Sequence, residues 1–428
     1  MITFQTPANL VIQRDETDRA VLPISGTCDL LVSSMYIKLV PVKEGWGTEV
    51  DVTLPVSAGK FSGTVTAKKG WYNLIAADEK GETQTQKIGV GDVFLVSGHS
   101  IASNNGKGYP ADLPIGERVI TLDFDNAAVS DLYNQKLDPS YIQYKFVPVS
   151  LRSQVAIGSD PQHWGNMAHQ LSEKFNCPVL VINVAYGGSN LEMWEKGIRG
   201  QKYGYFDNPD GPRADGQVFN WEKPMPWGTQ KQVLEKIISK TGIRAVLSHH
   251  GENDKQRTPE QVAGYYKTLI ETTRQYAPEV PWLINRASVC GRNPDGSILY
   301  LTEVRKAQEL TIQNVSKCFA GPDYDAAMNQ LKPGLNEALN LTAADRYDDL
   351  HLSVSGIRKA TGLWASAISS QITVLTPYVP VKPATQMNTT PDTLVVSPKP
   401  NKGSDYTVEI AVALLGVITF LILALRKE

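Results

Sequence analysis

Four short apolar runs in the middle of the chain restrict its fold more than any other feature. They are residues 93–97, 179–184, 244–247 and 281–285. Nearly continuous apolar runs are typical of strands buried on both faces, and the amphipathic segments between them are typical of helices. The sequence therefore predicts an α/β fold in which a parallel sheet carries helices on both sides. Ligands of such sheets bind beyond the carboxyl ends of the strands.

The first 88 residues follow another pattern. Short strands are predicted at residues 21–24, 36–42, 50–54, 61–66 and 71–77. Glycines lie between them, and strands with turns about every ten residues indicate a small antiparallel sandwich. We therefore expect an N-terminal β-sandwich domain over residues 1–88 and the α/β domain over residues 89–375.

The end of the chain is first rich in proline and then apolar. Six prolines punctuate residues 376–405, which indicates an extended linker. Residues 406–425 contain Glu409 as their only charged residue. A helix of this length spans about 30 Å, the thickness of the hydrocarbon core of a bilayer. We predict a C-terminal hydrophobic transmembrane helix, with a buried helix or a hydrophobic bundle in an oligomer as the alternative.

The charges that flank the apolar segment bear on its orientation. Arg426 and Lys427 follow it directly, which favours a cytoplasmic C-terminus and an extracytoplasmic body anchored to the membrane. The first residues of the chain show no secretory signal peptide, and this conflicts with that orientation. The sequence leaves the side of the membrane open.

Composition argues against two classes of protein. The chain has 42 basic and 44 acidic residues, so no excess of positive charge favours nucleic acid as a partner. Its four cysteines form no CxxC pair, which argues against a zinc ribbon. Cys290 and Cys318 could form a disulfide in an oxidising compartment, but buried free thiols are the expected state.

Polar residues and glycines follow three of the predicted strands. Ser100 comes after the strand 93–97 and a glycine, where its hydroxyl can project from the edge of the sheet. Gly187 and Gly188 follow the strand 179–184, and Asn253 follows the strand 244–247. Each feature alone is more typical of a turn or a helix cap.

A fourth feature lies near the end of the predicted α/β domain. Asp348 precedes His351 by three positions, so the carboxylate can bind one ring nitrogen and leave the other free as a base. A solvated surface loop is the alternative. All four features together would supply a nucleophile, two oxyanion donors and a base at one edge of the sheet.

These residues lie in segments that resemble the four sequence blocks of the SGNH (GDSL-like) hydrolases, in particular the sialate O-acetylesterases and related carbohydrate esterases. The blocks are residues 91–100 (GDVFLVSGHS), 183–189 (NVAYGGS), 251–254 (GEND) and 348–351 (DDLH). They occur in the family's order, and the likeness covers residues 89–372. The resemblance implies an SGNH-type, flavodoxin-like parallel sheet with flanking helices, and an N-terminal β domain is common in such proteins.

The resemblance also implies roles for individual residues. Ser100 would be the nucleophile, His351 the general base and then acid, and Asp348 the group that orients His351. The oxyanion hole would consist of the backbone N–H groups of Ser100 and Gly188 and the side-chain amide of Asn253. Gly187 is the alternative to Gly188 as the second donor. Such a site hydrolyses esters in two steps through an acyl-serine and needs no metal or cofactor.

Two histidines depart from the pattern of the family. His99 stands where the family usually has Gln before the nucleophile, and His250 stands where Gln commonly precedes Gly-Glu. Ile101 replaces an Asn. We expect His99, His250 and Glu252 to bind substrate or tune the site, with His99 and His250 in contact. A metal site is the alternative, although hydrogen bonds between the imidazoles would explain them without an ion.

The leading functional interpretation is a carbohydrate O-acetylesterase that binds acetylated carbohydrate and hydrolyses its acetyl esters. The main alternative is a catalytically weak or inactive protein of this fold that serves as a glycan-binding or structural surface protein. A third interpretation is an esterase for acyl chains longer than acetyl, which requires a deep apolar slot beside Ser100.

Overall fold

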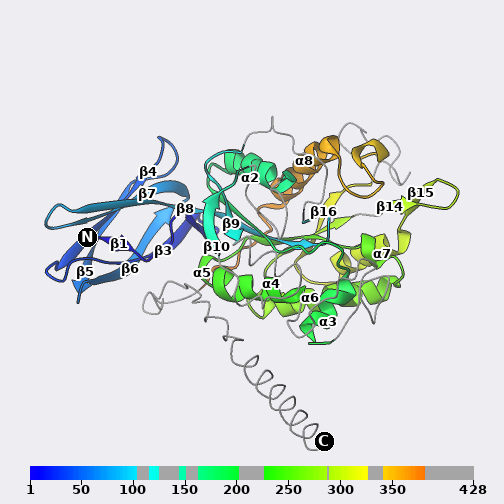
Figure 1. Cartoon of the computed structure of the whole chain (residues 1–428), viewed down its shortest axis with the longest axis horizontal. Coiled ribbons are helices and arrows are strands. Elements are labelled where there is room, and N and C mark those ends of the chain that lie inside the picture. Colours follow the sequence, from blue (N-terminus) through cyan, green and yellow to red (C-terminus); the bar gives the residue numbers. More distant parts are fainter. Residues whose placement is uncertain are drawn as a thin grey trace, which may run out of the picture. The chain divides into compact units, whose positions relative to one another are not determined.

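Strand β8 (Thr83–Gly98) connects the N-terminal β region to the parallel sheet. The computed structural model describes residues 1–103, 115–124, 144–150, 162–201, 226–286, 289–325 and 341–380. The first half of β8 pairs antiparallel with β7 (Gly70–Asp78), and its second half lies parallel between β11 (Val179–Asn183) and β12 (Ala245–His249). Residue 88, the predicted boundary, lies inside this continuous strand (Figure 1).

The N-terminal strands surround an apolar core. Besides β7 and β8 they are β1 (Thr3–Phe4), β2 (Leu10–Gln13), β3 (Arg19–Thr27), β4 (Ser34–Pro41), β5 (Val50–Ser57) and β6 (Lys60–Lys68). β3 pairs antiparallel with β6, and β4 pairs antiparallel with β5 and β7. Leu22 and Ile24 of β3 are buried because alternate side chains of a strand point to the same face. The predicted strands of this region are confirmed. β2, which was not predicted, joins β8 in parallel.

Six parallel strands among the described residues form the sheet that carries the candidate site. Their order is β9-β11-β8-β12-β13-β16, and β10 pairs antiparallel with β9 at the edge. The further bounds are β9 (Val119–Phe124), β10 (Tyr144–Pro148), β13 (Trp282–Arg286) and β16 (Cys318–Asp323). Without β9 and the edge strand β10, the chain order across the sheet is 2-1-3-4-5, which is the flavodoxin-like order. The predicted α/β fold with a flavodoxin-like sheet is confirmed, and the strand order reverses between β8 and β12.

Helices cover both faces of this sheet. Figure 1 shows α2 and α8 on one face and α4 and α6 on the other. On the first face Trp164 of α2 shares a buried cluster with Phe94 of β8, and on the second face Trp194 of α3 shares a cluster with Leu95. Among the described residues the helical segments are α2 (Gln162–Phe175), α3 (Leu191–Ile198), α4 (Trp227–Val233), η2 (Leu234–Ile238), α5 (Ser239–Thr241), η3 (Glu252–Asp254), α6 (Pro259–Arg274), α7 (Thr302–Asn314), η4 (Ala343–Asp345) and α8 (Val354–Gln371). A hairpin of β14 (Val289–Arg292) and β15 (Ile298–Tyr300) precedes α7.

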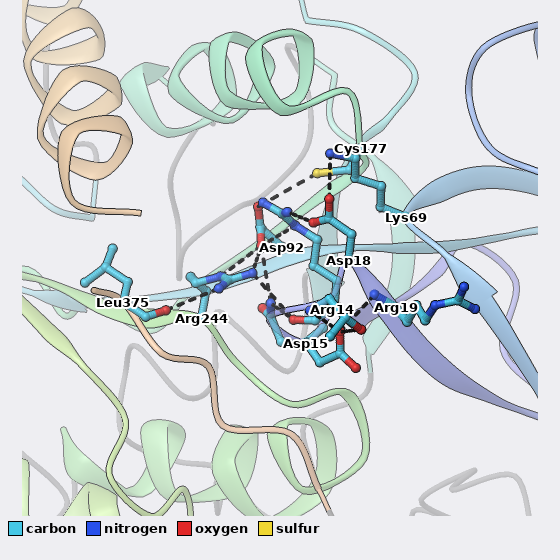
Figure 2. A network of polar contacts seen from close by, with 11 residues as sticks. Arg14, Asp15, Asp18, Arg19, Lys69, Asp92, Cys177, Arg244 and Leu375 are labelled. Carbon is cyan, nitrogen blue, oxygen red and sulfur yellow. Dashed lines mark hydrogen bonds and ion pairs between the residues drawn. The ribbon is translucent and has the colours of Figure 1, made fainter. Parts of the chain in front are cut away.

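A buried carboxylate ties the N-terminal strands to the parallel sheet. Asp92 of β8 accepts hydrogen bonds from Arg14, which follows β2, and from Arg244, which precedes β12; each arginine has an Nη2 atom at 2.8 Å. Figure 2 shows both guanidinium groups converging on this carboxylate. Burial raises the pKa of Asp92, but the two arginines outweigh it and hold the pKa below its ordinary value. The network fixes β2, β8 and β12 to one another.

The predictions for the C-terminal region concern residues that the structure does not describe. In the described part of the chain, no helix is both long and apolar enough to cross a membrane. The predicted transmembrane helix, residues 406–425, and most of the predicted linker lie outside the described residues.

The cysteines are free thiols. All four lack a disulfide partner, so Cys290 and Cys318 are not paired. Burial raises the pKa of each of these two thiols to about 11. Cys318 is a buried free thiol as expected, whereas Cys290 is free but only partly buried. Burial also raises the pKa of Cys28 and of Cys177, so none of the four is activated as a thiolate near neutral pH.

Candidate active site

Ser100 lies just beyond the carboxyl end of β8, where the strand order reverses. The adjacent strand β12 runs very close: the backbone N–H of His99 donates to the carbonyl of His249 at 3.2 Å. A Cβ atom on Gly98 would lie 2.5 Å from that carbonyl oxygen and 2.4 Å from the Cβ of Ala102. The close approach therefore requires glycine at this position. Ser100, two residues after Gly98, therefore lies at the edge of the sheet where ligands are expected.

Ser100, His351 and Asp348 form one hydrogen-bonded chain. The Nε2 atom of His351 lies 2.8 Å from Oγ of Ser100, and its Nδ1 atom lies 2.7 Å from Oδ2 of Asp348. An ionised carboxylate only accepts hydrogen bonds, so Nδ1 carries a proton and Nε2 of the neutral ring presents its lone pair to the hydroxyl. The structure thus brings together the three residues named from sequence as nucleophile, base and orienting acid.

Asp348 is held in its ionised form. Partial burial raises the pKa of this carboxyl, but hydrogen bonds from the side chain and backbone of His351 outweigh burial and hold the pKa below its ordinary value. The backbone N–H of His351 donates to Oδ1 at 2.7 Å. One carboxylate therefore fixes both the ring and the backbone of the histidine.

The loop that carries His351 is anchored on both sides. The backbone N–H of Tyr347 donates to the carbonyl of His351 at 3.0 Å. Ser353 begins α8 as its N-cap. Asp349 adopts a left-handed φ of 63°, and Arg292 of β14 binds its carboxylate through two hydrogen bonds of 2.8 Å. The imidazole therefore projects from a loop that leads directly into a capped helix and carries an exposed ion pair.

The predicted oxyanion donors lie on the segments that follow β8, β11 and β12. Within the described ranges, the backbone N–H groups of Ser100 and Gly188 donate to no acceptor. Gly188 has a positive φ of 73°, a conformation that favours glycine. Asn253 donates one amide hydrogen from Nδ2 to the carbonyl of Ser189 at 2.8 Å, which leaves the second amide hydrogen for another acceptor. Their role as an oxyanion hole stays a prediction.

The ring of His99 connects Ser100 to a buried carboxylate. Its Nδ1 atom lies 3.3 Å from Oγ of Ser100, and its Nε2 atom lies 2.7 Å from Oε2 of Glu252. The other oxygen of Glu252 lies 2.9 Å from Nε2 of His249. Burial raises the pKa of Glu252, but its attraction to His249 and His99 outweighs burial and holds the pKa well below its ordinary value. Glu252 is thus an ionised acceptor for two imidazoles.

The expected contact between His99 and His250 is wrong. The His99 ring packs edge-on against His249, with ring centroids 5.4 Å apart. His250 instead points to Ser97, whose Oγ lies 3.3 Å from its Nε2, and packs edge-on against Trp194 at 5.3 Å. Successive residues at the end of a strand face opposite sides, so His249 and His250 cannot both face His99.

The cluster of His99, His249 and Glu252 also has the donor types of a metal site. One donor atom from each lies within 4.8 Å of the others, and imidazole with carboxylate is a donor set that zinc accepts. The same donor atoms are joined to one another by hydrogen bonds of 2.7 and 2.9 Å. These bonds account for the cluster without an ion.

Sequence reasoning did not assign a role to His249 or to His163. His249 lies opposite Gly98 in the pairing of β12 with β8, and only this register shows which of the two adjacent histidines joins Glu252. His163 of α2 is fully buried against Trp164, with ring centroids 4.3 Å apart. Burial, and to a smaller extent His249, lowers its pKa to about 3. No local sequence signal distinguishes such a neutral core histidine from a functional one.

Comparisons with known proteins give matches in structure. No family model and no curated protein sequence matches the chain. A carbohydrate acetylesterase from Xanthomonas citri is similar with a TM-score of 0.49 and 15% identity, over 87% of this chain and 76% of that chain. A lipase/acylhydrolase from Enterococcus faecalis has a TM-score of 0.33 and 14% identity, over 65% and 96% of the two chains. A peptidoglycan O-acetylesterase has a TM-score of 0.29 and 13% identity, over 87% and 77%. Likeness at this level assigns no activity, so the function of the site has to come from its own residues.

Proposed function

We propose that this chain is a serine esterase that hydrolyses acetyl esters on carbohydrate. The observation that carries the proposal is the distance of 2.8 Å between Nε2 of His351 and Oγ of Ser100, in a ring whose Nδ1 atom is bound to Asp348. A serine hydroxyl becomes a nucleophile when an imidazole in this orientation accepts its proton.

The reaction proceeds through an acetyl-serine. Oγ of Ser100 attacks the carbonyl carbon of the acetyl ester while Nε2 of His351 takes the hydroxyl proton. The bond between that carbon and the sugar oxygen then breaks, and the sugar oxygen leaves with the proton from His351. In the second step His351 takes a proton from water, the hydroxide attacks the acetyl carbon, and Ser100 leaves with the returned proton as acetic acid is released.

Three donors are proposed to stabilise the negative oxygen that forms in each step. They are the backbone N–H groups of Ser100 and Gly188 and the amide of Asn253. Removal of one such donor costs about 3 to 4 kcal/mol of transition-state stabilisation, so Asn253→Ala is expected to reduce kcat by roughly a hundredfold or more.

The sequence blocks around the site are the reason for proposing acetyl esters of carbohydrate as the substrate class. The blocks that contain Ser100, Gly188, Asn253 and His351 resemble those of sialate O-acetylesterases and related carbohydrate esterases. His99 departs from the family pattern within the first of these blocks, and His250 departs from it directly before the third. The specific sugar is therefore best found with a panel of acetylated sugars rather than with sialic acid alone.

The proposal is tested by acetate release from the purified full-length chain. We expect hydrolysis of p-nitrophenyl acetate and of acetylated sugars, and loss of both in Ser100→Ala. A fluorophosphonate probe should label the wild-type protein on the peptide that contains Ser100. Binding of acetylated glycan without acetate release and without labelling would instead support the inactive, glycan-binding alternative. Faster hydrolysis of long-chain than of acetyl esters would overturn the acetyl assignment.

We also propose that residues 406–425 anchor the chain to a membrane. The support is the apolar composition of the segment, which contains one charged residue, Glu409. The full-length chain should sediment with membranes and resist extraction by carbonate, whereas a chain that ends at residue 405 should not. Equal behaviour of the two chains would dismiss the anchor.

A further inference from the structure

Two imidazoles contact the same hydroxyl oxygen. Oγ of Ser100 lies 2.8 Å from Nε2 of His351 and 3.3 Å from Nδ1 of His99. A hydroxyl has one hydrogen to donate and two lone pairs to accept with. Because Nε2 of His351 takes that hydrogen, the contact with His99 is a hydrogen bond only when Nδ1 of His99 carries a hydrogen and donates it to Oγ.

The second ring nitrogen of His99 is also a donor. Its Nε2 atom lies 2.7 Å from Oε2 of Glu252, and an ionised carboxylate offers only acceptors. With a hydrogen on each nitrogen the ring is an imidazolium, and the buried carboxylate supplies the opposite charge. A charge-assisted bond of this kind is stronger than one between neutral groups.

We propose that His99 is a second catalytic histidine, which donates a hydrogen bond from Nδ1 to Oγ of Ser100 while His351 exchanges the hydroxyl proton. This inference rests on the proposed esterase function, because it assigns a role in the same reaction. Both protons of His99 stay in place throughout. When the bond between Oγ and the acetyl carbon breaks in the second step, its electron pair moves to Oγ. The N–H of His99 then stabilises that charge until His351 returns the proton.

The groups around His99 favour a positive charge on this ring rather than on its neighbours. Glu252 on η3 and His249 at the end of β12 contact the ring, His351 shares Ser100 with it, and His250 lies near it but faces the other way. Burial holds the pKa of His249 and of His250 below the ordinary value, so these rings stay neutral. One carboxylate balances one cation, and a second buried cation would lack a partner.

The substitution H99Q separates the two contacts of His99. The amide nitrogen of glutamine lies where Nε2 of histidine lies, so H99Q keeps a donor for Glu252 and removes the donor for Ser100. Glutamine is also close in volume to histidine, which favours a folded variant. His169 of α2 offers a matched control, since its Nδ1 atom accepts from the backbone N–H of Gly116 and not from the site.

The test compares kcat for wild type, H99Q, E252Q and H169Q with p-nitrophenyl acetate as substrate. We expect H99Q to lose roughly ten- to a hundredfold in kcat, as for one hydrogen bond to a charged group, and H169Q to match wild type. E252Q should also lower kcat, because Nε2 of His99 loses the carboxylate that balances the charge of the ring.

Different results would overturn different statements. A folded H99Q with the thermal stability and kcat of wild type would overturn the role of His99 and leave the esterase in place. Loss of wild-type activity in a chelator with recovery in zinc would also overturn it, and would assign the cluster to a metal. A wild-type protein that neither hydrolyses esters nor reacts with the fluorophosphonate probe would overturn the proposed function itself, and the role of His99 with it.

Discussion

Nε2 of His351 lies 2.8 Å from Oγ of Ser100, although 251 positions separate the two residues in the chain. Ser100 follows β8, and His351 lies just before α8, which Ser353 caps. Trp364 of α8 packs against Trp164 of α2, with ring centroids 5.1 Å apart. The position of the imidazole therefore depends on how α8 packs on the face of the sheet that α2 also covers.

Asp348→Asn is expected to reduce kcat by about ten- to a hundredfold. An amide can donate to Nδ1 of His351, which favours the tautomer that carries its proton on Nε2 and so faces Ser100 with a hydrogen instead of a lone pair. The side chain of Asp348 is 41% exposed, so we expect a smaller effect than for a fully buried acid. Steady-state hydrolysis of p-nitrophenyl acetate gives the measurement.

Asp349→Asn is the matched control for that variant. The same substitution one residue later breaks an ion pair with Arg292, whose side chain is 48% exposed, and pairs this exposed contribute little to stability. Asn also tolerates the positive φ of residue 349. We expect D349N to keep most of its activity. Equal losses in the two variants would show that the loop, and not the contact of Asp348 with the imidazole, matters.

Gly98→Ala is expected to damage both stability and activity. The added Cβ would lie 2.4 Å from the Cβ of Ala102 and 2.5 Å from the carbonyl oxygen of His249. The ends of β8 and β12 would therefore have to move apart directly before Ser100. Gly264 of α6 is the control, because a Cβ there meets no atom within 4 Å. We expect G264A to stabilise the protein by about 0.5 to 1 kcal/mol. Urea unfolding and ester hydrolysis of both variants would check this, and a fully active G98A would contradict it.

Asp92→Asn is expected to destabilise the protein by about 3 to 5 kcal/mol at neutral pH, because two buried arginines lose their counter-charge. The pKa of Asp92 lies below its ordinary value in the folded state. The stabilisation is therefore present above the ordinary pKa of Asp, about 4, and is lost as the pH falls through the lower pKa of the folded state.

Urea midpoints of wild type, D92N and D18N at neutral pH test the Asp92 network. Asp18 also pairs with Arg14, but its side chain is 40% exposed, so D18N should cost at most about 1 kcal/mol. The difference between wild type and D92N should persist to about pH 4 and shrink only below it. Equal midpoints for D92N and D18N would show that the buried position of Asp92 adds nothing.

Asp254→Asn is expected to stabilise the protein more as the pH rises. Burial raises the pKa of Asp254 to about 8, so between about pH 4 and 8 the folded state holds a proton that the unfolded chain has released. The contribution of Asp254 to the free energy of unfolding therefore falls as the pH rises across that interval. Asn keeps an oxygen for the backbone N–H of Leu191, which lies 3.0 Å from Oδ1 of Asp254. The gain in unfolding temperature of D254N over wild type should grow from pH 5 to pH 8, and a constant or shrinking gain would contradict the raised pKa.

Much of the fold and of the candidate site could be predicted from local pattern. Continuous apolar runs predict β8, β11, β12 and β13 because burial on both faces demands apolar side chains at every position of a strand. Ser100 and the pair of Asp348 and His351 could be named because polar groups directly after buried strands and beside a helix cap have few purely structural uses in combination. The edge strand β10 does not follow this rule, because only some of its side chains are buried. β9 does follow it, since Val119, Ile120 and Leu122 are buried on both faces of the strand, although it was not predicted.

The tertiary structure alone decided which side chains meet. His249 and His250 are adjacent in sequence, and the register of β12 against β8 determines that His249 joins Glu252 and His99. The contact of His99 with Glu252 and the placement of Asp92 between Arg14 and Arg244 have no local signal either. Sequence periodicity reports which face of an element is buried, since that depends on neighbours along the chain. Contacts between elements depend on strand order, register and helix packing, which are set by the whole core at once.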